Sequence, residues 1–188
     1  MKQILFINAC VRGQSRTKRL AEHLLARLNG TVTELRLSEL PLCPLDEGVL
    51  ERRHEASVSG DFSDSLFSLA RQFAAADCIV IAAPYWDLSF PAALKLYLET
   101  ISVSGVTFTY TESGMPQGLC RAQRFYYVTT AGGVIGSMNH GYTYVESLFR
   151  TLFGITEGTC IRAERLDIEG LDPEQLLQEG FAAVDRLP

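Results

Sequence analysis

Short apolar runs that alternate with helical segments limit the fold of this chain most strongly. Ile4–Asn8 and Cys78–Ala83 are short and apolar, as is typical of strands buried on both faces of a sheet. The pattern predicts further strands at 31–37, 125–130 and 158–163, and helices at 16–29, 63–76, 91–100, 142–153 and from 172 onward. Strands separated by helices predict a five-stranded parallel sheet with helices on both faces, an α/β fold.

Two stretches interrupt this alternation. Pro41–Ser59 reads as a long polar connection that contains three consecutive basic residues, Arg52-Arg53-His54, of which His54 is expected to be solvated. Gly105–Cys120 alternates apolar and polar residues and then turns at Ser113-Gly114, which predicts an inserted hairpin. Long insertions on an α/β scaffold often carry function.

Length and composition exclude several classes of protein. A chain of 188 residues suits one domain over 1–188. The net charge of -5, with no long run of one sign, argues against nucleic acid or a membrane as the main partner, and no segment approaches the ~18 apolar residues of a membrane span. The five cysteines are scattered and form no Cys-x-x-Cys, which predicts no metal site and a reducing cytoplasm.

The first candidate site follows the first expected strand, because ligands of open parallel sheets bind beyond the carboxyl ends of the strands. Asn8–Thr17 joins that strand to a helix, and the free N–H groups of a helix N-terminus favour an anion. Ser15 and Thr17 add hydroxyls, while Arg12 and Arg16 add positive charge, a combination that suits a phosphomonoester. The alternative is that Ser15 only caps the helix. The loop matches neither the dinucleotide fingerprint nor the P-loop.

Two further strand ends carry candidate residues. Tyr85 and Trp86 directly follow the run Cys78–Ala83 and could cover a planar ring; a core or interface cluster of aromatics is the alternative. Gly132 and Gly133 follow the strand expected at 125–130 and could let the backbone approach a ligand closely, or could form only a tight turn.

Together these segments resemble the flavodoxin-like family of FMN-dependent NADH-azoreductases and NAD(P)H:quinone reductases. The resemblance is strongest over Ala83–Gly133, where Ala-Pro-Tyr-Trp-Asp and Gly-Val-Thr-Phe-Thr-Tyr-Thr-Glu look like the central block of that family. It implies a flavodoxin-like fold, bound FMN, NADH or NADPH as electron donor, a quinone or azo acceptor and a homodimer. In the last third of the chain only the order of helix and strand is similar.

The resemblance also implies roles for individual residues. The FMN phosphate would be held by Cys10, Ser15, Arg16 and Thr17. One side of the flavin ring would contact Tyr85, Trp86, Asp87 and Leu88, and the other side would contact Thr130, Ala131, Gly132 and Gly133. The chain departs from the family where Cys10-Val11-Arg12 replaces the common Ser-Pro-Arg, which predicts a weaker phosphate site because a thiol is a weak hydrogen-bond donor. It also has Asp87 where the family often has Asn, which would disfavour an anionic reduced flavin.

The expected activity is an oxidoreductase of ping-pong mechanism, in which the donor leaves before the acceptor binds and the cofactor supplies the redox chemistry. His140 is a candidate proton donor, since histidine titrates near neutral pH, although a lone histidine is more often a surface or capping residue. Tyr142 and Tyr144 are weaker candidates for the pocket wall. The alternatives are an electron carrier or a non-catalytic, flavin-binding regulatory protein. Asn8 and Pro84 argue against a phosphoacceptor receiver domain, which needs acidic residues at these strand ends.

Overall fold

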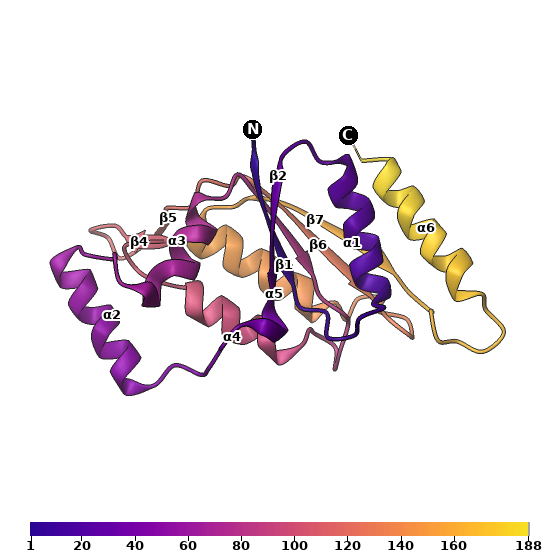
Figure 1. The fold of residues 1–188 in the computed structure, drawn as a ribbon, viewed down its shortest axis with the longest axis horizontal. Helices are drawn as coiled ribbons and strands as arrows, with labels where there is room; N and C mark the ends of the chain where they lie inside the picture. The colour runs from indigo at the N-terminus through magenta and orange to yellow at the C-terminus, as the bar shows by residue number, and fades with distance from the viewer. Residues whose placement is uncertain (188) are drawn as a thin grey trace.

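The computed structural model describes residues 1–187 and confirms the five-stranded parallel sheet. Its strands are β1 (Gln3–Asn8), β2 (Thr31–Arg36), β3 (Cys78–Ala82), β6 (Arg124–Thr130) and β7 (Glu157–Ala163). They pair in parallel in the order β2-β1-β3-β6-β7. Figure 1 shows this sheet with helices on both sides. The chain moves to one side of β1 to form β2 and to the other side to form β3. The topological switch point, where open α/β sheets bind ligands, therefore lies between β1 and β3.

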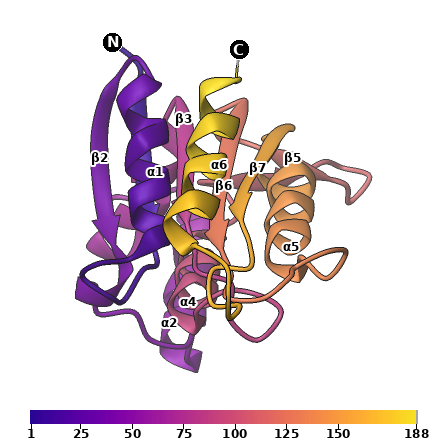
Figure 2. The same cartoon turned by 90° about the vertical axis from the view of Figure 1, so that its right-hand side faces the viewer.

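Helices cover both faces of the sheet. On one face, α1 (Arg16–Arg27) and α6 (Pro173–Asp185) lie side by side (Figure 2) and bury Leu20 and Leu177 against the strands. The other face carries α3 (Ser68–Ala75), α4 (Ala92–Ile101) and α5 (His140–Leu148), and its core is richer in aromatic side chains. Both layers place helix N-termini or loops at the carboxyl edge of the sheet.

Side-chain caps begin the two helices of the first face. Ser15 precedes α1 in an extended conformation and accepts a hydrogen bond from the amide of Lys18, as is typical of an N-cap. Asp172 does the same for α6, in which Pro173 is the first helical residue. The helix expected at 16–29 ends earlier, at Arg27. Gly30 serves a different purpose, because a Cβ there would lie 2.6 Å from the carbonyl oxygen of Lys2.

The expectation of a long polar connection over 41–59 was wrong, because residues Glu47–Ser59 form helix α2. Only Ala56 of this helix is buried, so the sequence has no apolar stripe to reveal it. Asp46 caps its start and Gly60, with φ +72°, ends it. Arg53 is half-buried and donates to the carbonyl oxygens of Glu99, Thr100 and Ser102 at the end of α4, whereas His54 is exposed as expected.

Two other helices differ from the expected boundaries. The segment 63–76 consists of a 3₁₀ turn at Ser65–Phe67 followed by α3. The helix expected at 142–153 begins two residues earlier, at His140, and ends in a π-helical turn over Phe149–Phe153 before Gly154. His140 is therefore the first residue of a helix.

The inserted hairpin is confirmed. Strands β4 (Phe108–Tyr110) and β5 (Pro116–Gly118) pair antiparallel, apart from the main sheet. Gly118 packs so closely on the end of the π-helical turn that an added Cβ would lie 2.2 Å from the carbonyl carbon of Phe153. Within residues 1–187, no helix is long and apolar enough to cross a membrane.

Candidate functional site

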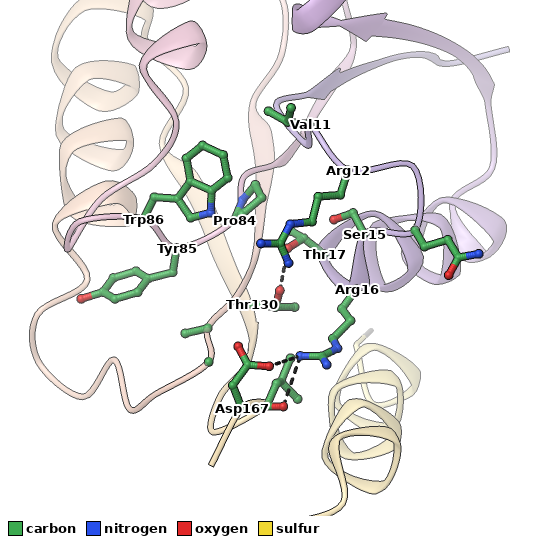
Figure 3. A pocket seen from close by; sticks show the side chains of 14 residues that line it. Val11, Arg12, Ser15, Arg16, Thr17, Pro84, Tyr85, Trp86, Thr130 and Asp167 are labelled. Atoms are coloured by element: carbon green, nitrogen blue, oxygen red, sulfur yellow. Dashed lines mark hydrogen bonds and ion pairs between the residues drawn. The ribbon is translucent and has the colours of Figure 1, made fainter. Parts of the chain in front are cut away.

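A pocket of about 310 Å³ lies at the carboxyl edge of the sheet (Figure 3). Its volume falls within the roughly 300–1,000 Å³ of small-molecule sites. The loops after β1, β3 and β6 and the segment after β7 line it, with Val11, Arg12, Gln14, Ser15, Arg16, Thr17, Pro84, Tyr85, Trp86, Thr130, Ala131, Gly132, Leu166 and Asp167. The pocket thus joins the three strand ends that the sequence singled out.

The N-terminus of α1 forms the first part of the pocket. Lys18 donates its amide to the hydroxyl of Ser15, and Arg19 donates its amide to the carbonyl oxygen of Ser15. The amides of Arg16 and Thr17 have no hydrogen-bond partner within residues 1–187. Because two donors and the positive end of the helix dipole meet here, this part of the pocket suits an anion.

Two arginines lie at this end of the pocket, and they differ in whether they form an ion pair. Arg12 is exposed, points toward Thr17 in Figure 3, and makes no ion pair within the described residues. Arg16 pairs with Asp167, with 2.7 Å between Nη1 and Oδ1, and also donates to the carbonyl oxygen of Leu166 at 3.2 Å. Arg12 therefore carries the unneutralised charge, which the sequence assigned equally to both arginines.

Cys10 does not line the pocket. Its side chain is 8% exposed and belongs to the core between the sheet and α1, with Sγ 3.8 Å from the carbonyl oxygen of Ala82. Its amide donates to the side chain of Asn8. Burial raises the pKa of the Cys10 thiol to about 11, so this group stays neutral and faces inward.

The loop after β3 places two aromatic side chains in the pocket. The amide of Tyr85 donates to the carbonyl oxygen of Thr130, and its hydroxyl donates to that of Met138 at 2.9 Å. These bonds tie Tyr85 to the neighbouring loop at both ends. Trp86 is 43% exposed, and Figure 3 shows both rings on the side of the pocket away from Arg16.

A tight turn follows these aromatics. Trp86 and Ser89 exchange backbone hydrogen bonds, and the two residues between them, Asp87 and Leu88, have φ angles of +49° and +66°. Leucine rarely adopts this left-handed conformation, and such strain clusters at functional sites. Asp87 and Leu88 are exposed and do not line the pocket.

The loop after β6 contributes Thr130, Ala131 and Gly132. The hydroxyls of Thr130 and Thr17 lie 2.6 Å apart and join this loop to α1. At Gly132 the close neighbour is a side chain of the protein, because an added Cβ would lie 2.4 Å from Oδ2 of Asp167. Gly133 does not line the pocket, and a Cβ there would meet nothing within 4 Å.

Residues Arg162–Asp167, which we call the β7 brace, hold this loop in place. The amides of Leu166 and Asp167 donate to the carbonyl oxygens of Ala131 and Gly132 at 3.1 and 3.0 Å. Glu164 accepts from the amide of Ile135 at 2.8 Å, and Arg162 donates to the carbonyl oxygen of Gly136 at 3.2 Å. The sequence reasoning missed the brace. The signal was its position after the last strand, whose carboxyl end must reach the same edge.

His140 lies outside the pocket lining. It is exposed at the start of α5, and its ring makes no hydrogen bond within residues 1–187. Tyr144 is 39% exposed, and Tyr142 donates to Glu146 at 3.0 Å. None of these three side chains contributes to the pocket as described, so the role of His140 stays a prediction.

The parallel sheet, with its strand order and a pocket at its switch point, is the architecture of a flavodoxin-like protein. A family model described as flavodoxin-like fold matches residues 2–187, and the chain belongs to this family.

Named relatives match nearly the whole chain. A protein of Clostridium acetobutylicum named FMN-dependent NADH:quinone oxidoreductase 2 is 36% identical over 191 residues, which cover 95% of this chain and 94% of the relative. An FMN-dependent NADH:quinone oxidoreductase of Clostridium perfringens is 33% identical, with 96% and 95% covered. The crystal structure of an azoreductase from Bacillus anthracis has a TM-score of 0.84 and 26% identity, with 98% and 97% covered.

Proposed function

We propose that this chain is an FMN-dependent oxidoreductase that transfers electrons from NADH, or NADPH, to a quinone, azo compound or similar flat, electron-poor acceptor. The observation that carries the proposal is the pocket, which combines an anion-binding end with an aromatic end. The similarity to relatives named FMN-dependent NADH:quinone oxidoreductases, over 95% and 96% of this chain, supports the same activity.

The residues of the pocket fit FMN at both ends. A phosphate needs hydrogen-bond donors and positive charge, which the amides of Arg16 and Thr17 and the side chain of Arg12 provide. The flavin ring needs flat apolar surface, which Tyr85 and Trp86 provide. Ala131 and Gly132, which have little or no side chain, would let the backbone come close to the other side of the ring.

When bound, FMN supplies the capacity to accept two electrons from a nicotinamide and to give them to a second substrate. The protein supplies orientation and shielding from water. The tie from Tyr85 to Met138 and the brace behind Ala131 and Gly132 would fix the two sides of the ring site. We propose a ping-pong order, because one partly open face beside Trp86 would serve donor and acceptor in turn.

We also propose His140 as the proton donor of the reaction. It follows the loop that lines the pocket, it is exposed, and it makes no hydrogen bond through its ring within residues 1–187. Histidine is the side chain that most often transfers protons in enzymes. Replacing His140 with Gln would then lower the rate of acceptor reduction and leave flavin binding unchanged.

A homodimer is part of the proposal. Large apolar side chains are exposed around the aromatic end of the pocket, namely Trp86, Leu88, Val134, Met138 and Tyr144, with exposed fractions of 39–60%. Exposed apolar side chains that gather in one region are typical of interfaces. Light scattering during size-exclusion chromatography measures the mass directly.

We place the protein in the cytoplasm because its five cysteines are free thiols.

One titration tests the proposed activity. The protein is incubated with FMN, freed of excess flavin and titrated anaerobically with NADH while visible absorbance is recorded. We expect the flavin to remain bound, its oxidised band to bleach stoichiometrically, and a quinone to restore it. Bound flavin that neither NADH nor NADPH bleaches would indicate a carrier or regulatory protein. Failure to retain any flavin would contradict the proposal.

A further inference from the structure

An acidic side chain lies at the end of the pocket that is built for an anion. Asp167 lines the pocket, is 69% exposed, and pairs with Arg16 at 2.7 Å. Arg16 completes this contact by donating to the carbonyl oxygen of Leu166, the neighbour of Asp167. The guanidinium of Arg16 is thus already bonded to the segment after β7.

The backbone fixes the position of this carboxylate. The amide of Asp167 donates to the carbonyl oxygen of Gly132, and the amide of Leu166 donates to that of Ala131. The carboxylate itself lies against Gly132, where an added Cβ would come within 2.4 Å of Oδ2. Asp167 therefore belongs to the β7 brace, and it is held beside the pocket independently of its pairing with Arg16.

The charges at this end of the pocket do not favour a phosphate as strongly as the number of arginines suggests. Arg12 and Arg16 contribute two positive charges, and Asp167 contributes one negative charge. A phosphomonoester carries about -1.5 to -2 charge at pH 7. With Asp167 ionised, the phosphate must compete with a carboxylate for Arg16 and also experiences its repulsion.

We propose that Asp167 is a specificity-determining residue of the flavin site: it competes with the flavin phosphate for Arg16, weakens the preference for FMN over unphosphorylated riboflavin, and so keeps FMN exchangeable. This inference rests on the proposed function, since it takes FMN as the ligand. It assigns the strength of phosphate binding to the segment after β7, which the resemblance to the family left without a role.

Equilibrium binding of two flavins tests the inference. The dissociation constants of FMN and of riboflavin are measured by quenching of flavin fluorescence for the wild type, Asp167→Asn and Glu169→Gln. The Asn side chain has nearly the same shape and still offers an oxygen to Arg16. Glu169→Gln is the matched control, because Glu169 is exposed on the same segment and lies outside the pocket lining.

We expect Asp167→Asn to tighten FMN binding about three- to tenfold at low salt. Most of this gain should disappear at high salt, because salt screens the interaction between an exposed charge and the phosphate. Riboflavin binding should change less than about twofold, because it lacks the phosphate that the charge acts on. The control should leave both constants unchanged. Equal weakening of both flavins by Asp167→Asn would overturn the inference and show that Asp167 only supports the pocket wall.

A double-mutant cycle tests the competition for Arg16 itself. In an Arg16→Gln background, Asp167→Asn should improve FMN binding less than about twofold, because the contested partner is absent. A gain of the same size in both backgrounds would contradict competition. If the wild type binds FMN and the variants do not shift it, only this inference fails. If the wild type binds neither flavin, the proposed function fails as well.

Discussion

The loop that follows β1 and the loop that follows β6 line the same pocket, but contacts of different range hold them. The first loop is held by its own helix, since Ser15 caps α1 and accepts from Lys18 three residues later. The second is held by the β7 brace, in which Glu164 bonds to Ile135 across 29 residues of sequence. The cap of the first wall is therefore a local contact, although Arg16 and Thr17 also bond to distant residues, whereas the bond that holds the second wall joins residues 29 positions apart.

Because of this difference, we expect a substitution in the β7 brace to lower the free energy of unfolding more than any other substitution proposed below. The carboxylate of Glu164 is 16% exposed and serves the amide of Ile135 and the guanidinium of Arg162. Glu164→Ala removes both bonds and leaves the amide of the buried Ile135 without its acceptor, so we expect a loss of about 2–3 kcal/mol in the free energy of unfolding. Urea denaturation at pH 7 measures it.

Glu169→Ala provides the control for that experiment. Glu169 is exposed on the same segment and makes no hydrogen bond or ion pair within residues 1–187, so its removal should change the free energy of unfolding by less than about 0.5 kcal/mol. If Glu164→Ala were equally neutral, the wall after β6 would be held by its own turn, and the contrast between the two walls would disappear.

The same contrast explains which parts of the site the sequence predicted. Ser15 and Arg16 lie where the short loop after β1 meets α1, so a short stretch of sequence contains the whole signal. Glu164 bonds to a residue 29 positions away and Asp167 pairs with Arg16, 151 positions away, and the residues beside them in sequence do not indicate these partners. Only the order of strands in the sheet, with β7 beside β6, brings them to the pocket.

Where the structure departs from the sequence analysis, the causes are equally local. Cys10 lies in the loop after β1, and its side chain turns into the core between the sheet and α1, a direction that a motif does not specify. Helix α2 escaped detection because Ala56 is its only buried residue, so its start depends on the Asp46 cap and not on apolar spacing. The central strands β1 and β3 were predicted because burial on both faces leaves a continuous apolar run, whereas the edge strand β2 is largely exposed.

A smaller effect is expected where the two walls meet. The hydroxyls of Thr17 and Thr130 lie 2.6 Å apart, and Thr17 is 1% exposed. Thr17→Val keeps the shape and removes the bond, so we expect a loss of up to about 1.5 kcal/mol in the free energy of unfolding. A cycle with Thr130→Val isolates the pair. Strictly additive losses would show that the walls are energetically independent.

The local wall itself should respond to the loss of its cap. Ser15→Ala removes the acceptor for the amide of Lys18, and a lost N-cap costs about 1 kcal/mol in the free energy of unfolding. Ser15→Thr, which can still cap, should retain most of that stability. Thermal and urea unfolding of the three proteins measure the difference. An unchanged Ser15→Ala variant would mean that contacts from other elements hold this wall too.

The smallest effect on stability, with a clear effect on binding, is expected for Arg12. Its guanidinium makes no ion pair within the described residues, so Arg12→Gln should change the free energy of unfolding by less than about 0.5 kcal/mol. FMN binding should weaken about five- to tenfold, because a charge-assisted hydrogen bond to the phosphate is lost, while riboflavin binding stays unchanged. Fluorescence titrations at low and high salt measure both.

Lys2→Gln is the control for Arg12, because it removes the same charge near the amino ends of the strands, away from the pocket lining. It should leave both flavins unaffected, since a distant surface charge is screened by salt. Equal weakening of FMN and riboflavin by Arg12→Gln would mean that this side chain shapes the wall and does not meet the phosphate. The anion would then be bound by the amides of Arg16 and Thr17 alone. The N-terminus of α1 would in that case both bind the phosphate and hold the first wall in place.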